Sequence, residues 1–228
     1  MRRVTLRYKP QKRARKHERA IVKDEFAIVL DYMPLGNPYD RHPQHRTSPV
    51  AQAIGTKYFT LVEIIPLREL SISVGERVPI ASMPNLPGHP VYDRLTYNDL
   101  TTVAKENLEK VLRQIVEEKE RVFVQFFNIA EPINIRLHSL ELLPGIGKKT
   151  LALILEERRK RPFESFEDIR RRLRINDPAK LFVDRLLTEL RCEERYYLFI
   201  DPYPPSSEYR RLGYLELLYK YTNYSDPW

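Results

Sequence analysis

The first half of the chain contains short apolar stretches rich in β-branched and aromatic residues, a composition typical of strands. They cover residues 25–33, 52–65, 77–80 and 92–97. Prolines and glycines separate them, and Gly55 lies where a bulge or sharp bend would suit the longest stretch. Several short, bent strands separated by turns predict a small closed barrel.

A helical pattern follows the fourth strand. From Asn98 or Asp99 to about Lys119, apolar residues recur at helical spacing and charges occupy the other side. We therefore expect one long helix packed against the sheet. The stretch RVFVQFF at 121–127 then returns to strand composition. It predicts a fifth strand, which would close the barrel.

In the second half, apolar periodicity over 140–143 stops at Pro144 and resumes over 151–155, which predicts two short helices joined by a turn. Ser165 opens another helix with capping-box spacing, and a proline-containing turn opens the last. Residues 134–191 are therefore expected to form two helical hairpins in tandem.

The last part of the chain is aromatic. The sequence YYLFI at 196–200 predicts a strand, and one interpretation returns it to the barrel, with the helical part as an insertion. The tail from Tyr203 is proline-rich at first. One helical face then carries Tyr214, Leu217, Leu218 and Tyr221. We expect this face to dock on the body of the protein.

The net charge of +8 is concentrated at the N-terminus. Residues 1–23 hold ten Lys or Arg and a single glutamate, whereas the other residues hold 29 basic and 30 acidic side chains. Such an arm suits unspecific attraction of nucleic acid, although a solvated, disordered tail explains it equally well. The candidates for contact are Lys12, Arg13, Arg15 and Lys16.

The single cysteine, Cys192, excludes an internal disulfide and a zinc site made of several thiolates. No apolar run approaches the roughly 18 residues of a membrane span, and the basic arm leads into no apolar signal core. We expect a cytoplasmic protein that does not engage membranes.

The segment LPGIGKKT at 143–150 is the stretch with a specific chemical meaning. Gly145 and Gly147 permit positive φ and close backbone approach. The amides of the turn and of the next helix's first turn would then face outward as a seat for an anion. Side chains of Lys148, Lys149 and Thr150 add charge and a hydroxyl.

This segment resembles the helix-hairpin-helix motif of nucleic-acid-binding proteins, in which a Leu-Pro-Gly-apolar-Gly turn grips the sugar-phosphate backbone. The resemblance implies that Gly145, Ile146 and Gly147 contact a phosphate together with the three residues that follow. The second hairpin lacks the glycines. Its arginines at 170–172 and 174 could offer side-chain contacts, but such a run is also typical of a solvated face. A hairpin that packs helices or docks protein is the alternative.

A five-stranded barrel with one helix resembles the OB-fold, a common binder of single-stranded nucleic acid. In that fold the helix usually lies between strands three and four, whereas here it follows the fourth predicted strand. Tyr32, Tyr58 and Phe59 are the aromatic candidates for base stacking, with Tyr58 preferred. Aromatic residues on strands are more often part of a core.

The loop 34–49 contains Asp40, His42 and His45, a set that invites a metal-site hypothesis. Two histidines three residues apart in a proline-broken loop present no fixed ligand face, and no cysteine joins them. We therefore expect no metal and no other cofactor.

The basic arm, the helix beginning YNDLTTVAKENLEKVL, the hairpin LPGIGKK and the sequence PFESFEDI together resemble an uncharacterised, mainly archaeal family described as predicted nucleic-acid-binding OB-fold proteins. The resemblance spans about residues 1–200. Genes of this family often lie beside those of ribosomal proteins and ribosomal-RNA methyltransferases, which implies RNA, rather than DNA, as the ligand.

The expected fold class is therefore α+β with two domains, a small OB-like β-barrel and an all-α tandem helix-hairpin-helix domain. The predicted organisation is a basic arm (1–23), the barrel with its long helix (24–131), the helical domain (132–194), and a return strand with an aromatic tail (195–228).

The expected function is non-catalytic binding of nucleic acid. One alternative is a DNA glycosylase or nuclease, because the hairpin also resembles that of glycosylases in which the lysine at the place of Lys149 is the nucleophile. The Val-Asp-Thr-His-like segment and the cysteine cluster that accompany it there are missing. The other alternative is a scaffold that docks protein in ribosome or transcription complexes.

Overall fold

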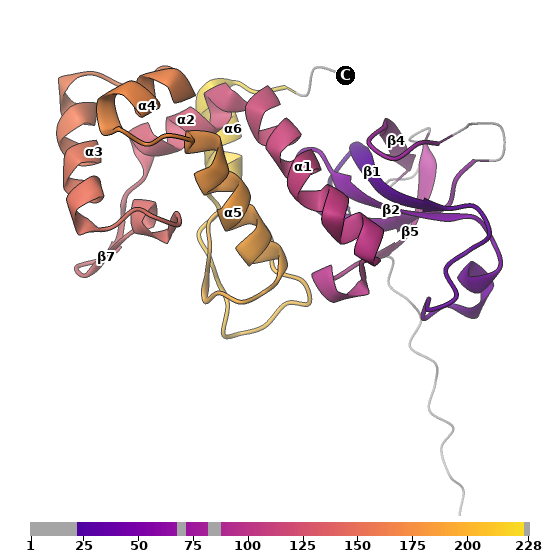
Figure 1. Ribbon diagram of the computed structural model, residues 1–228. Coiled ribbons are helices and arrows are strands. Elements are labelled where there is room, and N and C mark those ends of the chain that lie inside the picture. Colours follow the sequence, from indigo (N-terminus) through magenta and orange to yellow (C-terminus); the bar gives the residue numbers. More distant parts are fainter. Residues whose placement is uncertain (1–21, 68–71, 82–87, 226–228) are drawn as a thin grey trace, which may run out of the picture.

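The computed structural model describes residues 22–67, 72–81 and 88–225. A five-stranded sheet lies at one end of the molecule and α3 and α4 lie at the other, with α1 and α2 between them (Figure 1). The helices are α1 (Thr102–Glu118), α2 (Glu120–Ile129), α3 (Lys148–Lys160), α4 (Phe166–Leu173), α5 (Pro178–Leu190) and α6 (Tyr214–Thr222). Within the described ranges, no helix has the length and apolar character needed to cross a bilayer.

The sheet closes on itself. Its strands are β1 (Phe26–Met33), β2 (Val50–Gly55), β3 (Leu61–Ile64), β4 (Arg77–Ala81) and β5 (His89–Arg94). They hydrogen-bond in the order β1-β2-β3-β5-β4, and β4 also pairs with β1, which makes a closed barrel. The pair β4–β5 is parallel and the other pairs are antiparallel. Two predicted strands nevertheless need correction.

The stretch 52–65, expected as one strand, forms β2 and β3 with a turn between them. Gly55 ends β2 against a carboxylate: a Cβ built on it would lie 2.1 Å from the Asp24 Cγ, so a side chain does not fit. The Asp24 Oδ1 atom accepts hydrogen bonds from the amides of Lys57 and Tyr58, both at 2.8 Å. This distant carboxylate fixes the turn, and the local pattern gave no sign of it.

The predicted fifth strand at 121–127 is wrong, because these residues lie in α2. Phe123, Phe126 and Phe127 are fully buried, and their ring centroids lie 4.9, 6.1 and 5.9 Å from that of Phe182 in α5. Their spacing of i, i+3 and i+4 is the helical period, which the strand-like composition obscured.

Two cores meet at β1. Ala27 and Val29 belong to a core within the sheet, whereas Ile28 and Leu30 belong to a second core that includes residues of all six helices. Side chains of a strand alternate between its faces, so one strand serves both cores. The sequence analysis placed a domain boundary between residues 131 and 132. The second core contains residues from both sides of this point, so the boundary stays a prediction.

Both helices of the second hairpin begin where the sequence predicts. The Ser165 Oγ atom accepts the Asp168 amide at 3.0 Å, and the Asp177 Oδ1 atom accepts the Lys180 amide at 3.1 Å. These caps open α4 and α5. Before the glycine turn, however, the chain forms only a 3₁₀ turn, Ser139–Leu142, preceded by a small hairpin of β6 (Pro132–Asn134) and β7 (Leu137–His138).

The return strand also needs correction. Only β8 (Tyr196–Tyr197) is extended there, and it pairs in parallel with β9 (Arg210–Arg211) rather than with the five-stranded sheet. Three consecutive amides, at 198–200, instead donate to the fully buried carboxylate of Glu189 in α5 at 2.7–3.0 Å. These bonds satisfy the backbone that a sheet would otherwise pair.

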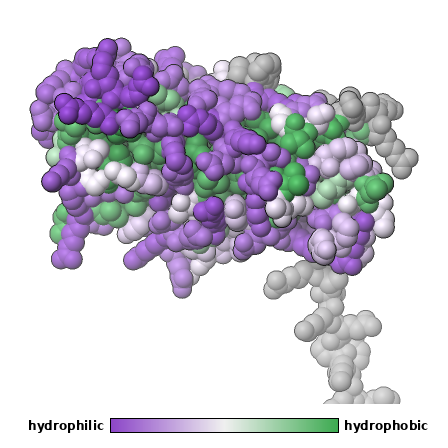
Figure 2. All heavy atoms as spheres, in the orientation of Figure 1, coloured by the Kyte–Doolittle hydropathy of each residue, from purple (hydrophilic) through white to green (hydrophobic). Residues whose placement is uncertain are grey.

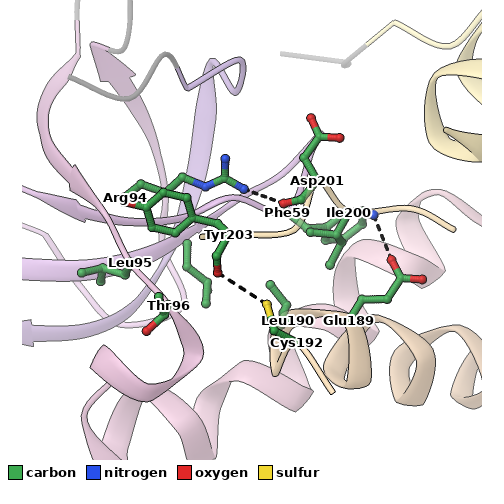
Figure 3. A pocket seen from close by; sticks show the side chains of 11 residues that line it. Phe59, Arg94, Leu95, Thr96, Glu189, Leu190, Cys192, Ile200, Asp201 and Tyr203 are labelled. Carbon is green, nitrogen blue, oxygen red and sulfur yellow. Dashed lines mark hydrogen bonds between the residues drawn. The ribbon is translucent and has the colours of Figure 1, made fainter. Parts of the chain in front are cut away.

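The segment that follows β8 still lies against β5 (Figure 3). The Arg94 guanidinium donates to the Asp201 carbonyl at 2.7 Å and lies 4.6 Å from the centroid of the Tyr203 ring. The Cys192 thiol donates to the Tyr203 carbonyl at 3.4 Å. This contact joins the end of the helical part to the closed sheet without strand pairing.

The tail docks on the body, as expected, through part of the predicted face. Tyr214 and Leu218 of α6 are buried, whereas Leu217 and Tyr221 are 40% and 61% exposed. The Tyr219 hydroxyl donates to the Lys57 carbonyl at 2.5 Å, which ties α6 to the turn between β2 and β3.

Candidate nucleic-acid interface

The two glycines of the hairpin have different conformations. Gly145 has φ +87°, a value that favours glycine, as the sequence predicts. Gly147 has φ −92° and ψ −179°, an extended conformation open to any residue. Among the described residues, a Cβ on Gly147 would meet no atom within 4 Å, and one on Gly145 would meet only the Leu181 side chain, at 4.0 Å. The space outside both glycines is therefore open to a ligand.

Ile146 anchors the turn. Its side chain is 5% exposed, and its amide donates to the Leu143 carbonyl at 3.1 Å. The predicted contact of Ile146 with a phosphate therefore cannot involve its side chain or this amide. Its burial holds the glycines on either side at the surface.

Gly147 is the N-cap of α3 and supplies no capping side chain. Its carbonyl accepts the Leu151 amide at 2.9 Å, which closes the first turn of the helix. Helical hydrogen bonding leaves the first amides of any helix without intrahelical partners, and the helix dipole makes that end partly positive. The N-terminus of α3, with no side-chain cap, has the electrostatics of an anion site.

Two lysines flank this end of α3. The Lys148 ammonium contacts the Glu141 carboxylate at 2.7 Å and the Arg136 carbonyl at 2.8 Å, while its side chain stays 70% exposed. Burial alone would raise the pKa of the Glu141 carboxyl, but hydrogen bonds from Lys148 and the His138 amide hold it below its ordinary value. Lys149 is exposed and Thr150 is half-buried. The glutamate therefore offsets part of the positive charge that the sequence places here.

The β6–β7 hairpin adds a residue that the sequence analysis did not single out. Ile135 is 99% exposed at its tip, beside Arg136, whose carbonyl binds Lys148. The Asn134 Oδ1 atom accepts the amides of Arg136 and Leu137 at 2.8 and 3.1 Å, which fixes the tip. The signal in the sequence is an asparagine turn that carries an isolated isoleucine.

The arginines of α4 differ in exposure, since the side chains of Arg170 and Arg171 are exposed and that of Arg172 is largely buried. The Arg172 side chain is 9% exposed and binds the carboxylates of Glu157 and Asp168 at 3.1 and 3.0 Å. Its guanidinium lies 4.2 Å from the centroid of the Phe163 ring. Arg172 therefore joins α3 to α4 and does not face a ligand. Hydrophilic residues gather over these two helices in Figure 2, but acidic partners interrupt the basic charge.

The aromatic candidates are distributed unequally. Phe59 is fully buried and belongs to the second core. Tyr58 is half-buried beside Tyr219, with ring centroids 6.3 Å apart, and the ammonium groups of Lys23 and Lys57 lie 5.6 and 5.9 Å from its ring. Base stacking by Tyr58 stays a prediction, and the two lysines would favour a phosphate nearby.

The predicted contacts of the basic arm, Lys12, Arg13, Arg15 and Lys16, lie outside the described residues. The hairpin residues 145–150 are contiguous and lead into α3, which lies at the opposite end of the molecule from β2 (Figure 1). Tyr58 lies in the turn between β2 and β3, beside Tyr219 of α6. The structure therefore does not bring the predicted contacts into one site.

The loop between β1 and β2 brings together the residues that the sequence analysis considered for a metal. Asp40, His42 and His45 lie in this loop, and the carboxylate of Glu63 on β3 joins them. Burial, and then the hydrogen bond and charge of Asp40, raise the pKa of Glu63 to about 9. Glu63 was missed because its strand pattern indicated only a place in the sheet.

The chain is similar to proteins of archaeal origin. Residues 23–201 match the family model described as "Protein of unknown function (DUF655)". "Uncharacterized protein MJ0038" of Methanocaldococcus jannaschii is 38% identical over 179 residues, which cover 78% of this chain and 80% of that protein. The crystal structure of Af1531 from Archaeoglobus fulgidus superposes with a TM-score of 0.70 at 42% identity, covering 78% of this chain and all of that one. The chain therefore belongs to the DUF655 family.

Proposed function

We propose that the protein is a non-catalytic nucleic-acid-binding protein that holds a phosphate backbone at the N-terminus of α3. The observation that carries this proposal is the glycine turn at 145–147, which leaves open space before a helix end without a side-chain cap. Lys148 and Lys149 add positive charge there. In this proposal the turn acts as a helix-hairpin-helix motif, and its contacts position the ligand without reading bases.

The closed sheet would hold an adjacent single-stranded segment in the manner of an OB-fold, with Tyr58 as the stacking residue. The arm would supply unspecific attraction. Linked weak sites gain affinity through effective concentration, so a structured ligand that reaches both ends should bind best. Structured RNA is favoured over DNA because of the family resemblance, and ribosome-associated proteins are the expected neighbours in the cell.

Fluorescence anisotropy tests this proposal. The full chain would be titrated against single-stranded RNA, hairpin RNA and duplex DNA over a range of salt. Hairpin RNA should bind most tightly, and binding should persist at physiological salt. Equal, weak binding of all three that vanishes with salt would contradict the proposal and leave only the arm as a binder.

Replacement of Gly147 isolates the hairpin. Val is compatible with an extended backbone, and its Cβ would meet no atom of the described residues within 4 Å, so Gly147→Val should fold but place a side chain where the phosphate approaches. We expect roughly tenfold or greater loss of affinity, with Gly147→Ala intermediate. Unchanged binding in both variants would exclude the hairpin as the site.

A protein-docking scaffold is the second candidate, favoured by Ile135, an apolar side chain 99% exposed at a fixed tip. A protein that ignores all three nucleic acids but co-purifies with one defined partner would support it. A glycosylase is a weaker candidate, because a nucleophilic lysine needs a pocket that lowers its pKa and Lys149 is exposed. Borohydride trapping of an imine on damaged duplex tests that activity.

A further inference from the structure

Four metal-ligating side chains converge beside the closed sheet, far along the chain from the glycine hairpin. Asp40, His42 and His45 come from the loop 34–49, and Glu63 comes from β3. They are 6%, 9%, 3% and 1% exposed, respectively. Carboxylates are rarely buried to this extent unless they are paired or bind a metal.

The spacing of their donor atoms matches one small coordination sphere. The His45 Nδ1 atom lies 2.5 Å from the Glu63 Oε1 and 4.0 Å from the Asp40 Oδ1. The His42 Nδ1 atom lies 3.1 Å from the same Asp40 oxygen and 3.7 Å from the same Glu63 oxygen. All four ligand atoms lie within 4.8 Å of one another. A tetrahedron with bonds of about 2.05 Å has edges of about 3.3 Å, so the four separations given above need changes of less than about 1 Å and the longest separation in the cluster needs at most about 1.5 Å.

We propose that Asp40, His42, His45 and Glu63 bind one divalent transition-metal ion in tetrahedral geometry, with Zn²⁺ as the fitting ion. Two imidazoles and two carboxylates are a donor set that zinc accepts. Two negative ligands around a divalent cation also give a buried site without net charge. Soft ions that prefer thiolates have no ligand here, because the chain's only cysteine, Cys192, lies in another part of the fold.

His45 provides a second, independent observation. Its side chain is 4% exposed, and its Nε2 atom is buried without a hydrogen-bond partner among the described residues. A buried polar atom without a partner costs about 1–3 kcal/mol, so such an atom needs an explanation. A 180° rotation about χ2 moves Nε2 to the position that Cε1 now occupies, so a bound ion would be engaged by Nδ1 in the present orientation and by Nε2 after the rotation.

The surroundings restrict and orient these side chains. The Tyr92 ring packs against both imidazoles, with centroids 4.7 Å from His42 and 4.0 Å from His45. The Asp93 carboxylate lies 3.6 Å from the His42 Nε2 atom, where its negative charge favours a ring orientation that places an Nε2–H toward it. Arg41 binds Asp93 at 2.6 Å, so this arginine is engaged outside the four ligands.

A surface hollow gives an ion access to the cluster. Its lining includes Tyr39, Asp40 and Glu63, together with residues 98–102 at the start of α1. Three of the proposed ligands lie in one loop, and the fourth lies on β3. A bound ion would therefore attach the loop to the sheet. The expected role of the ion is to stabilise this loop, which connects β1 to β2.

The test uses the full-length protein, freed of metal by a chelator and then titrated with Zn²⁺ and Co²⁺. We expect one ion per chain by elemental analysis, the intense visible absorption of tetrahedral Co²⁺, and a rise in the unfolding temperature with added Zn²⁺. His45→Gln and Glu63→Gln should each weaken Zn²⁺ binding by more than the roughly 10- to 100-fold that loss of an outer hydrogen bond costs.

His89→Gln is the matched control. His89 is also buried in the closed sheet, but its Nδ1 atom accepts the Leu67 amide at 3.0 Å and it lies outside the four ligands. This variant should bind Zn²⁺ like the parent protein. Absence of bound ion in the parent protein, preference for Mg²⁺ or Ca²⁺ over Zn²⁺, or undiminished binding in both ligand variants would each overturn the assignment.

Discussion

The glycine hairpin and the loop between β1 and β2 were both visible in the sequence, yet they differ in how far the sequence explains them. The hairpin residues 145–150 are contiguous, so one short stretch of sequence contains all of the residues that predict the site. The loop cluster is complete only with Glu63, which lies 18 residues beyond its partner His45. A local motif can be recognised before the fold is known, whereas a site assembled across strands cannot.

The largest expected effect is on the ion pairs that hold α4 against α3, the helix that follows the glycine turn. Asp168 accepts hydrogen bonds from Arg161, Arg171 and Arg172, at 2.7, 3.1 and 3.0 Å, and its side chain is 6% exposed. Asp168→Asn should cost about 3 kcal/mol of unfolding free energy, because it leaves buried Arg172 with a weaker partner. Denaturant unfolding measures this cost. Glu164→Gln is the control, since Glu164 is 76% exposed and should change stability by less than about 0.5 kcal/mol.

The same variant gives a pH dependence. Burial alone would raise the pKa of Asp168, but hydrogen bonds from Arg172 and Arg171 and the charge of Arg161 hold it below its ordinary value. The carboxylate therefore stabilises the fold above its unfolded pKa of about 3.9, and this contribution is lost as pH falls through the lower folded pKa. The stability difference between the parent and Asp168→Asn should shrink below about pH 4. A constant difference would contradict this role.

The second prediction separates the hairpin from the metal cluster. Replacing both Lys148 and Lys149 by Ala should weaken nucleic-acid binding roughly tenfold and reduce the salt slope by about 1.8 on duplex or about 1.4 on single strands. Zn²⁺ binding should not change. Lys110→Ala with Lys220→Ala removes the same charge from exposed positions elsewhere, and should leave the slope intact. If both double variants lost the same nucleic-acid affinity, the two hairpin lysines would contribute no more than other lysines on the surface.

A third, smaller effect concerns the tip beside the hairpin. If Ile135 buries part of its side chain on the ligand, Ile135→Ala should weaken binding about fivefold, or about 1 kcal/mol. Unfolding stability should stay within about 0.5 kcal/mol, because the side chain is 99% exposed. Leu35→Ala, 85% exposed in the other loop, is the matched control. Equal affinity of the parent, Ile135→Ala and Leu35→Ala would remove the tip from the interface.

The smallest expected change is a gain. Glu141 neutralises part of the Lys148 charge through a contact at 2.7 Å with an exposed ammonium. Glu141→Gln should tighten nucleic-acid binding about twofold, because it removes a negative charge that competes with the ligand for an ammonium that is 70% exposed, and an ion pair with so solvated a partner contributes only about 1 kcal/mol. Anisotropy titration at low salt gives the best resolution of this change. Weaker binding would mean that Glu141 positions Lys148 for the ligand instead of competing with it.

Local patterns predicted the starts of α4 and α5 correctly, but the predicted cap of the long helix at Asn98 or Asp99 is wrong, because Thr101 is the N-cap of α1. Ser165 and Asp177 cap α4 and α5 because a side-chain oxygen three residues before an amide needs no distant partner. The long helix α1 and the strand β1 followed from apolar spacing for the same reason. Where composition and spacing disagreed, at 121–127, composition was misleading: three phenylalanines at helical spacing pack on Phe182.

The sequence by itself determined the family of the chain, the glycine turn before α3 and the succession of strands followed by helices. These features depend on residues that are neighbours along the chain, where backbone sterics and capping act directly. Only the tertiary structure decided that Asp24 would fix the turn after Gly55, that Glu189 would bind the amides at 198–200, and that Glu63 would meet His45. Each is a buried carboxylate whose partners come from another segment, and burial of charge makes such partners necessary only once the chain has folded.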